Sequence, residues 1–299
     1  MSIRALYDVP APAKLNLFLH VVGRRADGYH LLQSVFVLID WADTLHFVLR
    51  SDGGLARHDL GLTLPADDLT LAAARALQAR SGTTLGADIS IDKRVPWAAG
   101  LGGGSSDAAT ALLALNRLWQ LDWPRNRLAQ LAATLGADVP FFVGGENALV
   151  EGVGERLTPL VVPQQWFAVV KPAAGLATRE VFAHPRLVRD TPAAILSGFL
   201  ADASQPDFWG HEAPAKLAYG RNDLQPAAED CCPEVALAAA WLDRHFGNCR
   251  MTGSGSAVFA RSGMGDQPLV KWPAETLPPG WVGRMCRGLD QHPLRDWAG

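Results

Sequence analysis

A glycine-rich loop in the middle of the chain constrains the fold more than any other stretch. Four of the five residues from 100 to 104 are glycine, and glycine lets the backbone adopt positive φ and approach a ligand closely. The apolar pattern predicts a strand over 87–92, before the loop, and a helix over 108–121, after it. Backbone N–H groups in such a loop, together with the start of the following helix, form a binding site for phosphate.

Two common phosphate-binding motifs do not fit this loop. G-x-x-x-x-G-K-[ST] requires a lysine before the serine, where this chain has Gly104, and G-x-G-x-x-G requires a glycine where it has Ser105. A flexible linker is a third interpretation, but linkers do not normally lie between a strand and an amphipathic helix. We therefore predict a polyphosphate cradle whose helix is capped by Ser105 or Ser106, with Asp107 in the first turn.

Composition indicates a globular protein of two domains in 299 residues. The net charge of −3 argues against a duplex nucleic-acid binder, which needs a basic face, so we expect no nucleic-acid partner. The four cysteines form no C-x-x-C pair and indicate reduced thiols, which predicts a cytoplasmic protein. We expect neither a signal peptide nor a membrane span.

The N-terminal third of the chain is predicted to form strands. Apolar residues alternate over 13–22, and Lys14 and Asn16 share the polar face, which from the pattern alone is a solvated face rather than the lining of a cleft. Two further strands are predicted over 32–39 and 44–49, linked at 40–43 as a hairpin.

Helices and strands are intermingled along the rest of the chain without regular alternation, which favours an α+β fold. Asp67 or Asp68 is predicted to cap the first helix. The predicted helices cover 69–80, 125–135, 179–182, 192–199 and 232–246, and further strands cover 147–150, 156–162, 166–171, 249–252, 256–260 and 281–287. A boundary near 163–165 predicts two domains, residues 1–162 and 163–299.

Three segments in order carry a family resemblance: residues 12–17 (P-A-K-L-N-L), 96–109 with its G-L-G-G-G-S-S core, and 251–259 (M-T-G-S-G-S-A-V-F). This order resembles the GHMP kinases, the superfamily of galactokinase, homoserine kinase and mevalonate kinase. Residues 25–30 (R-A-D-G-Y-H) and 136–142 (G-A-D-V-P-F-F) narrow the resemblance. They are similar to the family that phosphorylates 4-diphosphocytidyl-2-C-methyl-D-erythritol in the non-mevalonate isoprenoid pathway.

The resemblance implies a two-domain GHMP kinase fold with an N-terminal ribosomal-protein-S5-like α/β sandwich and a C-terminal ferredoxin-like domain. It implies that ATP, accompanied by Mg²⁺, binds to the N-terminal half and that the substrate lies in a cleft between the halves. No metal site made by the protein's own residues is predicted. We expect small-molecule partners, no membrane partner, and a monomer or weak homodimer.

The resemblance also implies the residues of the site. Asp138 is the base that accepts the proton of the substrate hydroxyl, and Lys14 is its charge partner; a carboxylate base contributes about 10²–10⁴-fold to such a reaction. The residues implied to hold the ATP phosphates are Pro96, Trp97, Ala98, Ala99, Gly100, Leu101, Gly102, Gly103, Gly104, Ser105 and Ser106. The residues implied to hold the cytidyl substrate are Asn16, Tyr29, His30, Thr178 and Phe182.

Two alternatives remain at this point. The first is another small-molecule kinase of the superfamily, for homoserine or a sugar, although those substrates have no base to stack on Tyr29 and Phe182. The second is a non-catalytic nucleotide sensor or RNA-binding module. The negative net charge of the chain and the pairing of Lys14 with Asp138 argue against the second alternative.

Overall fold

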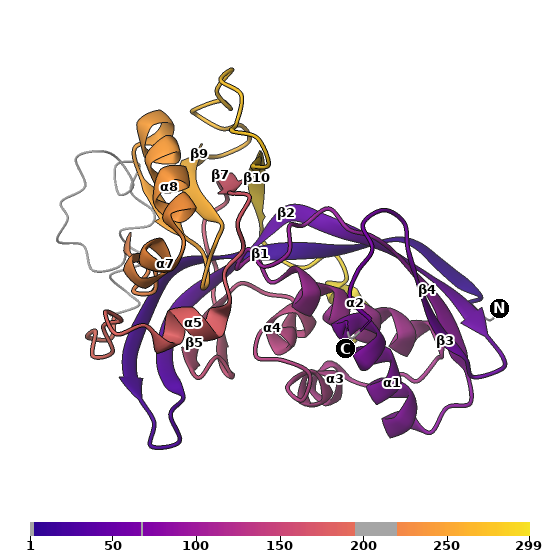
Figure 1. Cartoon of the computed structure of the whole chain (residues 1–299). Helices are drawn as coiled ribbons and strands as arrows, with labels where there is room; N and C mark the ends of the chain where they lie inside the picture. Colours follow the sequence, from indigo (N-terminus) through magenta and orange to yellow (C-terminus); the bar gives the residue numbers. More distant parts are fainter. Residues whose placement is uncertain (1–2, 67, 195–219) are drawn as a thin grey trace.

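The computed structural model describes residues 3–66, 68–194 and 220–299. Its strands form one mixed sheet in the order β3-β4-β2-β10-β7-β9-β8, in which β1 and β5 also pair with β2, and β6 pairs with β5 (Figure 1). Among the strands of the described residues, β3 and β4 pair in parallel and the other pairs are antiparallel. The predicted α+β class is confirmed.

The elements of the first half are β1 (Ala5–Arg24), β2 (His30–Arg50), β3 (Leu55–Asp59), α1 (Leu69–Ser81), β4 (Gly86–Asp92), α2 (Gly103–Leu118), α3 (Arg125–Ala132), α4 (Val139–Gly144), β5 (Ala148–Gly152) and β6 (Arg156–Pro159). Those of the second half are β7 (Gln165–Lys171), α5 (Thr178–Ala183), α7 (Gln225–Cys231), α8 (Pro233–Phe246), β8 (Cys249–Met251), β9 (Val258–Met264), β10 (Val282–Leu289) and the 3₁₀ turn η2 (Arg295–Trp297).

Two long antiparallel strands, β1 and β2, run through both halves of the molecule (Figure 1). The predicted hairpin over 32–49 is wrong, because the polar stretch 40–43 stays within β2. Asp43 in this stretch is fully buried, and its carboxylate accepts the N–H groups of Arg94 and Val95. The polar residues that resemble a turn therefore attach the strand to the segment that leads into the glycine loop.

The polar face of β1 is buried, which corrects the expectation of a solvated face. Lys14 is 3% exposed and Asn16 is 1% exposed. The second half of the chain covers this face, since the Asn16 N–H donates to Thr252 Oγ1 at 2.9 Å and Arg250 donates to the Leu17 carbonyl at 2.9 Å. A pattern within one strand does not reveal a cover that comes from more than 200 residues away.

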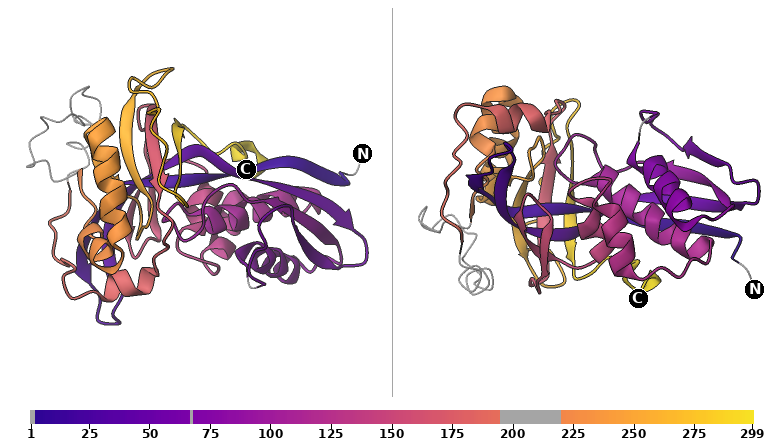
Figure 2. Two further views of the ribbon diagram at one scale, coloured as in Figure 1. Left: turned by 45° about the horizontal axis from the view of Figure 1, so that its top comes forward. Right: turned by 90° about the horizontal axis from the view of Figure 1, so that it is seen from below.

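Helices α1, α2, α3 and α4 lie on one side of the N-terminal sheet and form its core with β2 and β4 (Figures 1 and 2). Asp68 caps α1 as predicted, accepting the N–H groups of Thr70 and Leu71. Helix α2 begins at Gly103, five residues before the predicted start, and neither serine caps it. Its N-cap is Gly102 at φ 71°, a left-handed conformation that favours glycine over a serine cap.

The second half packs α7 and α8 against β7, β8 and β9, at the other end of the molecule from α1 (Figure 2). Helix α8 matches the prediction within one residue, and the predicted helix over 192–199 lies mostly outside the described residues. All four cysteines are free thiols. In the ranges that the structure describes, no helix is long and apolar enough to cross a membrane.

The C-terminal residues return to the first half of the molecule. Strand β10 pairs with β2 at its end, and the Gly299 carbonyl accepts the N–H of Arg125 at the start of α3. The Arg117 guanidinium of α2 lies over the ring of Trp297 at 5.0 Å. The division into residues 1–162 and 163–299 stays a prediction.

Candidate active site

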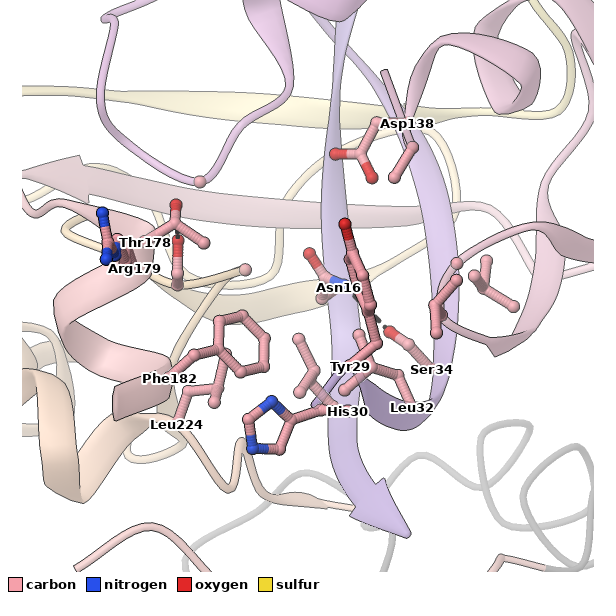
Figure 3. A pocket seen from close by; sticks show the side chains of 18 of the residues that line it. Asn16, Tyr29, His30, Leu32, Ser34, Asp138, Thr178, Arg179, Phe182 and Leu224 are labelled. Atoms are coloured by element: carbon pink, nitrogen blue, oxygen red, sulfur yellow. Dashed lines mark hydrogen bonds between the residues drawn. The ribbon is translucent and has the colours of Figure 1, made fainter. Parts of the chain in front are cut away.

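A pocket of about 1030 Å³ opens between β1, the start of β2, α5 and the loops of both halves (Figure 3). Loop residues Ala98, Gly100 and Gly102 reach it from one side. The pocket also brings together every residue predicted to be catalytic or substrate-binding: Lys14, Asn16, Tyr29, His30, Asp138, Thr178 and Phe182.

Lys14 and Asp138 form an ion pair at one end of this pocket, with Lys14 Nζ 3.6 Å from Asp138 Oδ2. Lys14 lies on β1, and Asp138 immediately precedes α4. The Asp138 side chain makes no capping hydrogen bond to α4 and is 32% exposed, so its carboxylate is available to a ligand. Figure 3 shows this carboxylate across the pocket from His30.

The surroundings of Lys14 make its charge act strongly on nearby groups. Its Nζ donates to Asn16 Oδ1 and lies 4.6 Å from the centre of the Phe36 ring. Burial lowers the pKa of Lys14, and the Asp138 carboxylate opposes that shift. A weakly solvated ammonium interacts more strongly with an adjacent carboxylate or phosphoryl group than one in bulk water.

The glycine loop is packed tightly against the third motif of the chain. Gly100 has φ 74°, and a Cβ atom there would lie 2.2 Å from the Thr252 carbonyl oxygen. Gly102 has φ 71°, and its Cβ would lie 2.9 Å from the Phe142 ring and 3.1 Å from Lys14 Cγ. Glycine at these positions therefore lets the loop contact Thr252 and the lysine at the same time.

The start of α2 faces the loop and leaves backbone donors free. The Ser106 N–H donates to the Gly102 carbonyl, so the preceding N–H groups of the first turn have no acceptor in the helix. Such a helix start favours bound anions. Ser106 is buried and donates its hydroxyl to the Pro12 carbonyl at 2.6 Å, whereas Ser105 is half-buried.

Not every residue of the predicted phosphate loop reaches the pocket. Ala99 and Leu101 are buried in the core beside β1, and the Lys14 N–H donates to the Leu101 carbonyl at 2.9 Å. Trp97 is 59% exposed and does not line the pocket. The ATP-binding assignment of residues 96–106 stays a prediction.

A buried charge cluster behind the loop was not assigned a role from the sequence. Lys93 Nζ lies 2.5 Å from a carboxylate oxygen of Asp43 and 2.6 Å from one of Asp107. Burial raises the pKa of Asp107 to about 7, although Lys93 opposes the shift. Because α2 begins at Gly103, Asp107 lies in its second turn and not in the first turn as predicted. The cluster connects β2 to this part of α2 and so holds the start of the helix in position.

The other end of the pocket is aromatic. The His30 and Phe182 rings lie 5.0 Å apart with an interplanar angle of 35°, and Tyr29 is 65% exposed beside them (Figure 3). Burial lowers the pKa of His30, and the cations of Arg189 and Arg24 lower it further. Thr178 forms a 2.7 Å hydrogen bond with the Ser254 hydroxyl, which joins α5 to the third motif.

Two cationic residues in the pocket, Arg24 and Arg179, were not predicted from the sequence. Arg24 belongs to the end of β1 and Arg179 to α5, and no motif marks either of them. Both line the pocket that holds the aromatic rings, so the pocket combines positive charge with aromatic faces. In the described part of the chain, no group of three or more His, Cys, Asp or Glu side chains is arranged to hold a metal ion.

Comparisons with known proteins agree with this geometry. A family model described as "GHMP kinases N terminal domain" matches residues 68–146, and one described as "GHMP kinases C terminal" matches residues 210–263. A protein of Methylibium petroleiphilum named 4-diphosphocytidyl-2-C-methyl-D-erythritol kinase is 62% identical, with 100% of each chain covered. A protein of Variovorax paradoxus with the same name is 57% identical over 99% of this chain and 100% of its own.

Solved structures show the same similarity. A crystal structure of 4-(cytidine 5'-diphospho)-2C-methyl-D-erythritol kinase has a TM-score of 0.68 and 36% identity, covering 86% of this chain and 89% of its own. The homoserine kinase of Cytophaga hutchinsonii has a TM-score of 0.61 at 18% identity, covering 87% and 85%. At 18% identity, the similarity to homoserine kinase concerns the fold alone.

Proposed function

Because the chain belongs to the family of 4-diphosphocytidyl-2-C-methyl-D-erythritol kinases within the GHMP kinases, we propose that it phosphorylates the 2-hydroxyl of 4-diphosphocytidyl-2-C-methyl-D-erythritol. Membership makes the chain a kinase, a phosphotransferase that uses ATP and has an alcohol group as acceptor. The proposed reaction is a step of the non-mevalonate isoprenoid pathway.

The ion pair of Lys14 and Asp138, 3.6 Å apart inside the pocket, is the observation that carries the proposal. In the proposed reaction the substrate oxygen attacks the γ-phosphorus, the bond to the β-phosphate oxygen breaks, and ADP leaves. Asp138 accepts the hydroxyl proton. Lys14 stabilises the negative charge of the transferring group, since phosphoryl transfer depends mainly on positioning and charge stabilisation.

We propose that the ATP phosphates lie on the free N–H groups at the start of α2, which the glycine loop leaves accessible. Mg²⁺ would arrive with ATP and reduce the charge repulsion among the phosphates. Oxygen ligands suit Mg²⁺. Because the Ser106 hydroxyl is used by Pro12, the Ser105 hydroxyl is the group of this loop that would touch it.

The cytidyl group is proposed to bind at the aromatic end of the pocket. A pyrimidine ring stacks on aromatic side chains for about 1–3 kcal/mol per base, and Tyr29 and Phe182 present such faces. Arg24 and Arg179 carry the positive charge that a diphosphate needs. Asn16 and Thr178 lie between the two ends of the pocket and suit the methylerythritol hydroxyls. A monomer or weak homodimer in the cytoplasm stays a prediction.

A coupled ADP-release assay with purified protein tests the function. We expect kcat/KM for the cytidyl substrate to exceed that for homoserine or galactose by about 100-fold or more, because those acceptors fill neither the aromatic nor the cationic part of the pocket. Comparable or faster turnover of homoserine or galactose would assign the chain to another kinase of the superfamily. ATP binding without turnover of any acceptor would support a non-catalytic module.

A further inference from the structure

One arginine outside the pocket contacts two residues of its aromatic end, the ring of His30 and the backbone of Phe182. Arg189 Nε donates to His30 Nε2 at 3.0 Å. Its two terminal nitrogens donate to the carbonyl of Phe182 within α5, at 3.2 Å, and to the carbonyls of His184 and Leu187 after the helix. Arg189 does not line the pocket. It therefore acts on a bound ligand through the groups that it positions.

This contact determines which nitrogen of His30 carries the proton. An arginine side chain has no acceptor, so Nε2 of His30 must accept and the neutral ring must carry its proton on Nδ1. Figure 3 shows one ring nitrogen of His30 directed toward the space beside Phe182 and the other directed away. Since Arg189 takes Nε2 from outside the pocket, the group presented to a ligand is Nδ1–H.

We propose that Arg189 fixes His30 as a hydrogen-bond donor and thereby makes the pocket select cytosine over uracil. This inference rests on the proposed binding of the cytidyl group between Tyr29 and Phe182. Cytosine has acceptors at N3 and O2, whereas uracil has an N–H donor at N3. A donor facing a donor leaves two polar groups unpaired, which binding sites reject strongly.

Binding of CDP and UDP, measured by titration calorimetry, tests the inference without the chemical step. We expect the wild type to bind CDP more tightly than UDP. In Arg189→Met the dissociation constant for UDP divided by that for CDP should fall by about tenfold or more, because His30 is then free to adopt either tautomer. Arg189→Lys, which keeps a cationic donor, should restore part of the preference. The KM for ATP should stay unchanged in both variants.

Arg186→Met is the matched control. Arg186 lies three residues before Arg189, is 66% exposed, and pairs with Asp230 on α7 rather than with the pocket. Its loss should leave the preference for CDP unchanged. A general loosening of the segment after α5 would lower the preference in both methionine variants, whereas loss of the proposed contact lowers it in Arg189→Met alone.

The pH dependence of the preference for CDP distinguishes the proposed role of Arg189 from a purely structural one. The charged groups that act on His30 are Arg24 of β1 and Arg189, and both lower its pKa. Removing Arg189 should raise that pKa toward its ordinary value. Because the imidazolium carries a proton on both nitrogens, the preference for CDP should recover in Arg189→Met as the pH falls. The wild-type preference should stay constant.

The outcomes separate the inference from the function on which it rests. If His30→Ala lost the CDP preference while Arg189→Met kept it at every pH, the inference would be wrong and the function would stand. If the wild type bound CDP and UDP equally and Tyr29→Ala changed neither, the proposed cytidyl site would be wrong. If Arg189→Met failed to fold, the ¹⁵N NMR spectrum of wild-type His30 would test the inference instead. A proton on Nδ1 of the neutral ring would support it, and a proton on Nε2 would contradict it.

Discussion

Replacing Lys93 by methionine removes the cation that lies between two buried carboxylates. Asp43 is fully buried and Asp107 is 3% exposed, and both lie within 2.6 Å of Lys93 Nζ. Methionine keeps the length of the side chain but leaves both carboxylates without the charge that compensates them. We therefore expect Lys93→Met to destabilise the fold and to weaken ATP binding, because the N-terminal half of α2 loses its attachment to β2 through Asp107.

The expected loss is about 3–5 kcal/mol at neutral pH, the usual consequence of removing one partner of a buried ion pair. At roughly 2–4 °C per kcal/mol for a protein of this size, Tm should fall by about 6–20 °C. The pKa of Asp107 in the folded state is raised to about 7 from 3.8. Because Lys93 opposes that shift, its removal raises the folded-state pKa of Asp107 further. Ionising Asp107 then costs the variant more stability than the wild type, so the loss should grow as the pH rises above about 7.

Urea unfolding monitored by tryptophan fluorescence at several pH values measures this loss. Arg94→Met is the control, because Arg94 is 64% exposed and forms a surface pair with Asp92, for which about 1 kcal/mol or less is expected. Adding Asp43→Asn and Asp107→Asn to Lys93→Met should recover much of the stability. A loss no larger than that of Arg94→Met, or one independent of pH, would refute the assignment of a buried charge cluster.

Two further variants test the two ends of the pocket. Gly100→Ala should raise the KM for ATP and lower kcat, because its Cβ would lie 2.2 Å from the Thr252 carbonyl at a φ of 74°; steady-state kinetics with wild-type values would contradict the tight packing of the loop. Tyr29→Ala should raise the KM for the cytidyl substrate and leave that for ATP nearly unchanged, with an unaltered Tm because Tyr29 is 65% exposed. A rise in the KM for ATP instead would mean that the two ligands exchange places.

Features that depend on neighbouring residues were predicted well from the sequence. The glycine run, the capping of α1 by Asp68 and the span of α8 are local, because propensity and capping act within a few residues. The order of three motifs predicted the two-domain GHMP kinase fold, which is confirmed by the family models and the similar crystal structure. The pocket also unites the seven residues expected to bind substrate or catalyse its reaction.

Features that depend on distant residues were predicted wrongly or not at all. The polar face of β1 reads as solvated because the covering residues, Arg250 and Thr252, come from the far end of the chain. The serines after the glycine run resemble a helix cap, yet Ser106 binds the Pro12 carbonyl instead. Arg189 has no motif around it, and its contact with His30 joins residues 159 positions apart.

The turnover of Asp138→Asn tests whether Asp138 is the catalytic base. The side chain is 32% exposed and caps nothing, so the amide should preserve fold and both Michaelis constants while removing the base. We predict that kcat falls by about 10²–10⁴-fold. We also predict that adding Lys14→Met costs less than its separate effect, because the two residues act as a unit. A kcat near that of the wild type, with normal Michaelis constants, would contradict the assignment of Asp138 as the base.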